Sequence, residues 1–342
     1  MVKLLGPGHP FRLSALLLGC VLPVVGCGGT GISGSAAMKH VETWVKDIGP
    51  RPPGSPEIRK KAKYIYDNLT ALGLKPQLMT WTDPAEKIEF QNVWVEIPGK
   101  DPAAGPILGI GAHYDTKKTE GHPEPQQNFR FVGAIDGGGG PAVLLELARV
   151  LKDRKNGPNI WLIWLDGEES LEFEWNTKRS LFGSRYFADA MGKDKVRFPK
   201  GFSERFRVFV LLDLVGSKNP KVDRDVLSNA ELLEIFTAAA DELGEKARMF
   251  KFEPPGGITD DHEPFRNKGA AVINLIDFAH RIPAERMRAN PNEKAPEKHP
   301  DYDAWWHTER DNLDAMSTDS LAFFGNLVLK ALPGIEQKFY AK

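Results

Sequence analysis

The chain has 342 residues, and its 45 Lys and Arg against 46 Asp and Glu give a formal net charge of −1. Hydrophobic residues make up 41% and charged residues 27%, which is ordinary for a globular protein and excludes a disordered chain. The balanced charge argues against a nucleic-acid-binding protein, which needs a basic excess to neutralise phosphates.

The N-terminal segment has the pattern of an export signal. Lys3 and Arg12 precede an apolar run over residues 13–26, which is shorter than the roughly 20 residues that span a bilayer. Residues 24–27, Val-Val-Gly-Cys, resemble a bacterial lipobox with Cys27 as the lipidated residue. The alternative is a plain signal peptide in which Cys27 is incidental.

These features predict three parts: a signal peptide of lipoprotein type over residues 1–26, a flexible Gly/Ser tether over 27–36, and one folded domain over 37–342. We therefore expect an exported protein, in the periplasm or at the cell surface, that meets a membrane only through an N-terminal lipid. Cys20 and Cys27 are the two cysteines, so a metal site elsewhere needs His, Asp and Glu.

Apolar runs alternate with amphipathic stretches through the rest of the chain. Helical spacing predicts helices over residues 37–47, 57–72, 140–151, 180–190, 229–243 and 318–339. Apolar runs predict strands over 91–97, 107–112, 160–165, 206–212 and 271–276. This alternation predicts an α/β fold with a mixed or parallel sheet covered by helices on both sides.

Polar residues follow three of the predicted strands. His113 and Asp115 come after one strand, Glu168 and Glu169 after another, and Asp213 after a third. Ligands of open α/β sheets bind beyond the carboxyl ends of strands, so these side chains could converge. Taken singly, a His-x-Asp sequence is more often a capped turn, and a carboxylate at a strand end is usually a solvated turn residue.

Two further residues could complete a metal site. Asp136 precedes four glycines and a predicted helix, and its alternative role is a helix N-cap. His307 lies in Trp-Trp-His-Thr, and its alternative is a histidine in a surface loop. With oxygen and imidazole donors and no thiolate, zinc is the natural metal. Adjacent Glu168 and Glu169 suit a division between proton transfer and metal binding.

The motifs GAHYDT, AIDGG, LDGEE, LLDLVG and WHT resemble the zinc aminopeptidase superfamily. Within it, the segments FVGAID, SLFGSRYFA, ITDDHEPF and WWHTERDNLD are similar to animal-type glutaminyl-peptide cyclotransferases, the glutaminyl cyclases, in family order over about residues 113–314. The resemblance implies a single-domain three-layer α/β/α sandwich with a central mixed, largely parallel sheet, as in the zinc aminopeptidases.

The resemblance also implies an activity: conversion of an N-terminal glutamine of peptides or proteins to pyroglutamate, with release of ammonia. It implies one zinc ion held by Asp136, Glu169 and His307, with Glu168 as general acid/base. The remaining implied roles are hydrogen bonding around Glu168 by Asp213 and Asp260, and a pocket wall formed by Trp306 and Trp175.

The main alternative is a two-zinc aminopeptidase, in which Glu168 activates water. There Asp136 bridges two ions, His113 and Asp213 hold the first, and Glu169 and His307 hold the second. His113, Asp115 and Asp213 are thus the candidates for an additional metal ion or for hydrogen bonding around the metal ligands. A non-catalytic surface binding module is the third interpretation, although such a module has no need of Glu168. The sequence leaves the number of zinc ions and the oligomeric state open.

Overall fold

The computed structural model describes residues 31–193, 205–254, 256–279, 281 and 305–341. The predicted signal peptide and Cys27 lie outside these ranges. Within them, no helix has the length and apolar character needed to cross a membrane.

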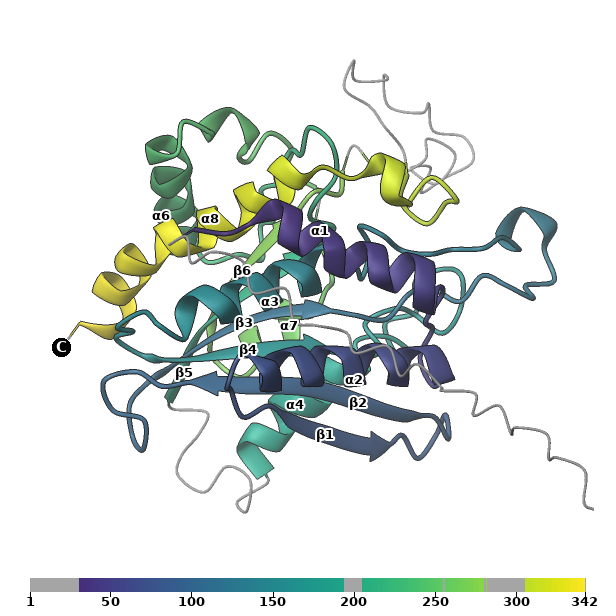
Figure 1. The fold of residues 1–342 in the computed structure, drawn as a ribbon, viewed down its shortest axis with the longest axis horizontal. Coiled ribbons are helices and arrows are strands. Elements are labelled where there is room, and N and C mark those ends of the chain that lie inside the picture. The colour runs from purple at the N-terminus through teal and green to yellow at the C-terminus, as the bar shows by residue number, and fades with distance from the viewer. Residues whose placement is uncertain (1–30, 194–204, 255, 280, 282–304, 342) are drawn as a thin grey trace, which may run out of the picture.

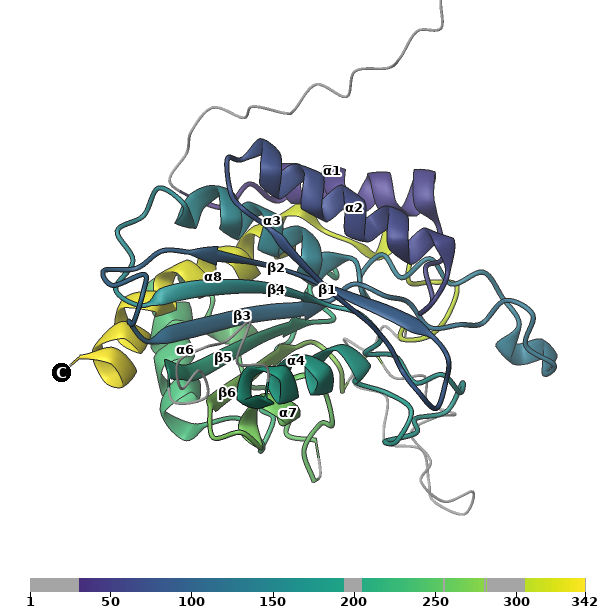
Figure 2. The ribbon, with the colours of Figure 1, turned by 90° about the horizontal axis from the view of Figure 1, so that it is seen from below.

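A sheet of six strands forms the centre of the molecule (Figures 1 and 2), in the order β1-β2-β4-β3-β5-β6. β1 pairs antiparallel with β2 and β2 with β4, whereas β3 pairs parallel with β4 and β5, and β5 with β6. The bounds are β1 Gln77–Thr82, β2 Glu89–Ile97, β3 Ile107–His113, β4 Asn159–Leu165, β5 Phe206–Asp213 and β6 Ala271–Ile276.

Helices cover both faces of this sheet, and Figure 2 shows α1, α2 and α3 on one side and α4 and α7 on the other. The helices are α1 Gly34–Thr43, α2 Pro56–Ala71, α3 Gly139–Leu151, α4 Phe182–Lys193, α6 Ala230–Glu242, α7 His262–Arg266 and α8 Thr318–Ile335. The predicted three-layer sandwich with a mixed, largely parallel sheet is confirmed.

Each face of the sheet has its own hydrophobic core, because side chains alternate along a strand. In β4, Ile160, Leu162 and Trp164 pack with α3 and α8, whereas Trp161 and Ile163 pack with α4 and α7. Both cores are buried, which is why this strand is apolar from Ile160 to Leu165.

The tether prediction is wrong for its last residues. Ile32 is 8% exposed, the Ser33 amide donates to Glu146 at 2.9 Å, and α1 begins at Gly34. A Cβ on Gly34 would lie 1.8 Å from the Thr318 carbonyl oxygen. This glycine therefore permits close packing of α1 against α8, although its Gly/Ser surroundings are typical of a linker.

Two elements are absent from the sequence prediction. β1 is an edge strand whose burial alternates weakly, so its apolar signal is faint. α7 has five residues, too few for a helical period to be visible. All the elements that were predicted appear, with ends shifted by a few residues. The last helix continues from α8 into a π-helical turn over Glu336–Tyr340.

Candidate metal centre and active site

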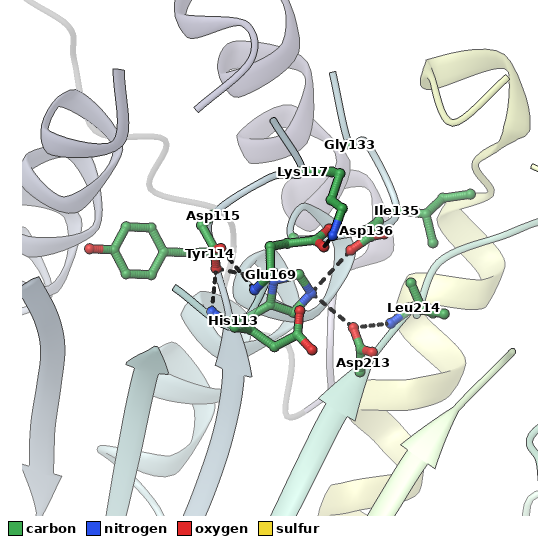
Figure 3. A network of polar contacts seen from close by, with 12 residues as sticks. His113, Tyr114, Asp115, Lys117, Gly133, Ile135, Asp136, Glu169, Asp213 and Leu214 are labelled. Atoms are coloured by element: carbon green, nitrogen blue, oxygen red, sulfur yellow. Dashed lines mark hydrogen bonds and ion pairs between the residues drawn. The ribbon is translucent and has the colours of Figure 1, made fainter. Parts of the chain in front are cut away.

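The predicted site residues gather beyond the carboxyl ends of the neighbouring strands β4, β3 and β5 (Figure 3). His113 is the last residue of β3, Asp213 is the last residue of β5, and Glu168 and Glu169 follow β4. Asp136 comes from the loop before α3. These strands run parallel, so their ends meet at one edge of the sheet.

Two groups of ligand-type atoms share Asp136, and within each group the atoms lie within 4.8 Å of one another. We call them the His113 half, formed by His113, Asp136 and Asp213, and the His307 half, formed by Asp136, Glu169 and His307. All members are buried, and the largest exposed fraction among them is 8%, for Asp213.

In the His307 half, one imidazole nitrogen faces two carboxylates. His307 Nε2 lies 3.2 Å from Glu169 Oε1 and 3.4 Å from Asp136 Oδ2. Asp136 Oδ2 is buried and has no hydrogen-bond partner among the described residues. A buried carboxylate oxygen is costly unless a proton or cation satisfies it. These donors fit a zinc ion, which binds imidazole nitrogen and carboxylate oxygen.

His307 is held in an unusual backbone conformation, with φ of 49°. A non-glycine residue in this left-handed region costs about 1–3 kcal/mol and persists where the surroundings impose it. The Asp311 amide donates to the Thr308 carbonyl at 3.1 Å, closing the turn after His307. His307 is 5% exposed, so the surface-loop alternative is wrong.

The His113 half forms a closed hydrogen-bond network. His113 Nε2 lies 3.0 Å from Asp213 Oδ1 and 3.2 Å from Asp136 Oδ1, and its Nδ1 lies 3.4 Å from Asp115 Oδ1. Figure 3 shows His113 between Asp115 on one side and Asp136 and Asp213 on the other. Burial opposes protonation of His113, but Asp213 and the other carboxylates outweigh it and raise its pKa well above the ordinary value.

Asp115 is outside both groups of ligand atoms and acts on the backbone instead. Its carboxylate accepts the amides of Glu168 and Glu169 at 3.2 and 3.1 Å. Asp115 therefore links the end of β3 to the two glutamates after β4. The N-cap alternative for Asp136 is also wrong, because Gly138 occupies the N-cap of α3 without a side-chain hydrogen bond.

Glu168 has the electrostatic character of a proton-transfer group. Burial raises its pKa well above the ordinary value; Glu169, Asp260 and Asp213 add to the rise, whereas His113 opposes it. Such a pKa brings a carboxyl closer to the neutral range in which general acid/base catalysis works best.

Asp213 and Asp260 affect Glu168 through their charge, while their own hydrogen bonds go elsewhere. Asp213 bonds to His113, and Asp260 Oδ2 accepts from Asn274 Nδ2 at 2.8 Å. Burial raises the pKa of Asp260 well above the ordinary value, and Asp213 adds to the rise. Among the described residues no hydrogen bond joins either aspartate to the Glu168 side chain, and the two carboxyls influence its proton affinity through their charge.

A cavity of about 350 Å³ opens onto the His307 half. Its lining includes Glu168, Asp260, Trp175 and Trp306, so the structure brings the predicted proton-transfer and pocket residues together. The Trp306 ring packs edge-to-face against Phe278, with centroids 5.1 Å apart. The volume is at the small end of ligand pockets, which run from about 300 to 1,000 Å³, and suits a single amino-acid residue.

Lys117 and Phe278 are site residues that the sequence prediction missed. Lys117 Nζ lies 3.3 Å from Glu169 Oε2 and donates to the Ser170 carbonyl at 3.1 Å, and the side chain is 1% exposed. Lys117 stands two places after Asp115 in HYDTKK, beside a second lysine. No sequence signal separates the buried lysine from its exposed neighbour.

Comparison with known proteins places this geometry in context. A model of peptidase family M28 matches residues 92–332. The Bos taurus glutaminyl-peptide cyclotransferase-like protein is 31% identical over 247 residues, which cover 66% of this chain and 62% of the relative. The chain thus spans less than two thirds of the length of that relative.

Solved structures align over more of the chain. A glutaminyl cyclase from an Acidobacteriales bacterium is 29% identical with a TM-score of 0.74, covering 93% of this chain and 99% of the other. The Porphyromonas gingivalis glutaminyl cyclase is 25% identical with a TM-score of 0.70, covering 89% and 98%. The resemblance drawn from the sequence motifs is confirmed.

Proposed function

Because the chain belongs to peptidase family M28, we propose that it is a zinc-dependent glutaminyl-peptide cyclotransferase. Its substrates are peptides or proteins that begin with glutamine, and its products are the N-terminal pyroglutamate and ammonia. The observation that supports this most strongly is that buried Glu168 and Trp306 line the same small cavity as the His307 half.

The proposed zinc ligands are Asp136, Glu169 and His307, and we propose one ion per chain. When bound, zinc acts as a Lewis acid that polarises the γ-carboxamide carbonyl of the glutamine. Burial opposes ionisation of Asp136, but the neighbouring His113 and His307 outweigh it and lower the pKa of this carboxyl. Asp136 is therefore ionised and ready to bind a cation at neutral pH.

Glu168 moves the proton in this reaction. The α-nitrogen attacks the carbonyl carbon of the γ-carboxamide group, so a C–N bond forms within the same residue and the bond from that carbon to the amide nitrogen breaks. Glu168 accepts the proton that the α-amine loses and delivers it to the departing nitrogen, which leaves as ammonia. Because nucleophile and electrophile belong to one residue, the pocket mainly holds the folded-back conformer.

Two peptides that differ only in their first residue test the proposal. Purified protein is incubated with a Gln-initiated and a Leu-initiated peptide, and pyroglutamate, ammonia and free amino acids are measured. We expect pyroglutamate and ammonia from the first peptide and no product from the second. Free leucine without pyroglutamate would contradict the proposed reaction and favour a two-zinc aminopeptidase.

The protein acts outside the cytoplasm in this proposal, as a lipoprotein anchored through Cys27. The support is the charged, apolar and lipobox pattern over residues 1–27. Membrane fractionation of cells that express the full chain and its Cys27→Ser variant tests it. We expect the parent in the membrane fraction and the variant outside it; equal distribution of both would contradict the anchor.

A further inference from the structure

The loop that carries Asp136, residues 132–137, is bonded along its backbone to three buried ionisable side chains. Arg51, Lys61 and Asp311 are each 0% exposed. They come from the segment before α2, from α2 itself and from the segment after His307. None of them is among the site residues that the sequence predicts.

Asp311 accepts three consecutive amides of this loop. Its Oδ1 accepts from Ile135 at 2.7 Å, its Oδ2 accepts from Asp136 at 3.0 Å, and its carbonyl oxygen accepts from Ala134 at 3.5 Å. The backbone of one proposed zinc ligand is thus fixed by a residue in the turn that follows another, His307. Asp311 joins two segments that are far apart in the sequence.

Arg51 and Lys61 bond the carbonyl groups of the same loop. The Arg51 guanidinium donates to the carbonyls of Val132 and Gly133, both at 2.7 Å. The Lys61 amine donates to the Gly137 carbonyl. Arg51 Nε also donates to the Tyr114 carbonyl at 3.2 Å, which ties the loop to the end of β3.

Burying these charged groups around the loop has a free-energy cost that a simple connection between two elements would not require. A buried guanidinium or carboxylate loses its hydration, and the loss is offset only by well-placed hydrogen bonds. Burial lowers the pKa of Arg51 to about 10, with Asp311 opposing the fall, so the guanidinium stays charged at neutral pH. These hydrogen bonds fix the position of Asp136, the residue common to the His113 and His307 halves.

We propose that Asp311 and Arg51 are positioning residues that preset Asp136 for metal binding by holding the peptide groups on its N-terminal side. The inference rests on the zinc site of the proposed function and not on the identity of the substrate. Partners that orient a metal ligand from outside typically change metal affinity by about 10–100-fold.

Zinc affinity tests the proposal. The dissociation constant is measured by chelator competition for the full chain and for Asp311→Asn and Arg51→Lys, and each protein is also loaded with cobalt(II) for its visible spectrum. We expect Asp311→Asn to bind zinc about 10–100-fold more weakly, because its amide group presents a donor to a backbone donor. Arg51→Lys keeps the positive charge but loses the guanidinium that donates to two carbonyl groups at once, so we expect a smaller loss of zinc affinity.

Two variants separate positioning from general stability. Asp314→Asn changes an exposed acid in the same segment, and we expect unchanged zinc affinity. Val328→Ala removes buried volume from α8; we expect a lower melting temperature with unchanged zinc affinity and cobalt spectrum. Equal zinc affinity of Asp311→Asn and the parent would overturn the positioning role alone, whereas a parent that binds no zinc would overturn the proposed site as well.

Discussion

The two halves of the acidic cluster share Asp136 and have similar residues, yet their surroundings differ. In the His113 half, both imidazole nitrogens face carboxylates at 3.0–3.4 Å. In the His307 half, Asp136 Oδ2 has no hydrogen-bond partner within the described ranges, and neither has His307 Nδ1. The first half is satisfied by hydrogen bonds alone, and the second is not.

The two halves also differ in their access to the cavity. Asp136, Glu169 and His307 line the cavity, and His113 is not among its lining residues. A catalytic metal needs a position open to substrate, which the His307 half offers. The lesson is that five ligand-type residues do not by themselves specify two metal ions, because a buried histidine can be satisfied by its carboxylate neighbours.

Removing each histidine in turn should give the largest contrast. We expect His307→Ala to weaken zinc binding by more than the about 10–100-fold typical of an outer partner, because a direct ligand is lost. We expect His113→Ala to retain close to the parent's zinc content while losing stability. Zinc analysis after dialysis measures both; equal zinc loss in the two variants would mean that the halves bind metal alike.

Glu168→Gln should separate proton transfer from metal binding within the cavity. We expect kcat to fall by about 10²–10⁴-fold, since the amide cannot carry the proton, while zinc content stays unchanged. Steady-state assays with a Gln-initiated peptide measure the rate. The control is Glu174→Gln, an exposed glutamate on the same segment, which should leave kcat unaltered; a Glu168→Gln enzyme as active as that control would remove Glu168 from the mechanism.

The pH dependence should report the charge around Glu168. Its raised pKa means that the protonated, inactive form persists to higher pH than for an ordinary glutamate, so kcat/KM should rise with pH through that pKa. Asp260→Asn removes a carboxyl whose ionised form raises the pKa of Glu168, and should move this acid limb toward lower pH by roughly one unit. A limb that stays in place would show that Asp260 does not act on Glu168 through its charge.

Much of this comparison was predictable from sequence, and the limits have physical causes. The strands β3, β4 and β5 are recognisable in the sequence because strands buried on both faces are largely apolar, and His113, Glu168 and Asp213 are conspicuous because polar residues end these runs. Asp136 and His307 have no such strand in front of them. Their roles came from resemblance to a family and not from periodicity.

The supporting residues were out of reach for a different reason. Arg51, Lys117 and Asp311 are charged residues in loops, and such residues are usually exposed. Their burial depends on which carbonyls and amides the folded chain brings to them, such as the Ile135 and Asp136 amides at Asp311. That information resides in tertiary contacts and leaves no local pattern.

The smallest effect we expect concerns the wall of the cavity beside the His307 half. Asp223 accepts the amides of Phe278 and Ala279 at 3.0 and 2.7 Å, and burial raises its pKa to about 8. A carboxyl whose folded pKa exceeds its unfolded value of about 3.9 favours folding most below that value. This contribution is lost as the pH rises from about 4 to about 8.

Asp223→Asn should therefore flatten the pH dependence of the melting temperature between about pH 4 and 8, because the amide does not titrate. Thermal unfolding followed by circular dichroism across this range measures the change, and Asp153→Asn, at an exposed acid, provides the matched control. If Asp223→Asn and the parent gave parallel curves, the carboxyl would be ionised throughout. The hydrogen bonds from Phe278 and Ala279 would then outweigh the effect of burial on the pKa of Asp223.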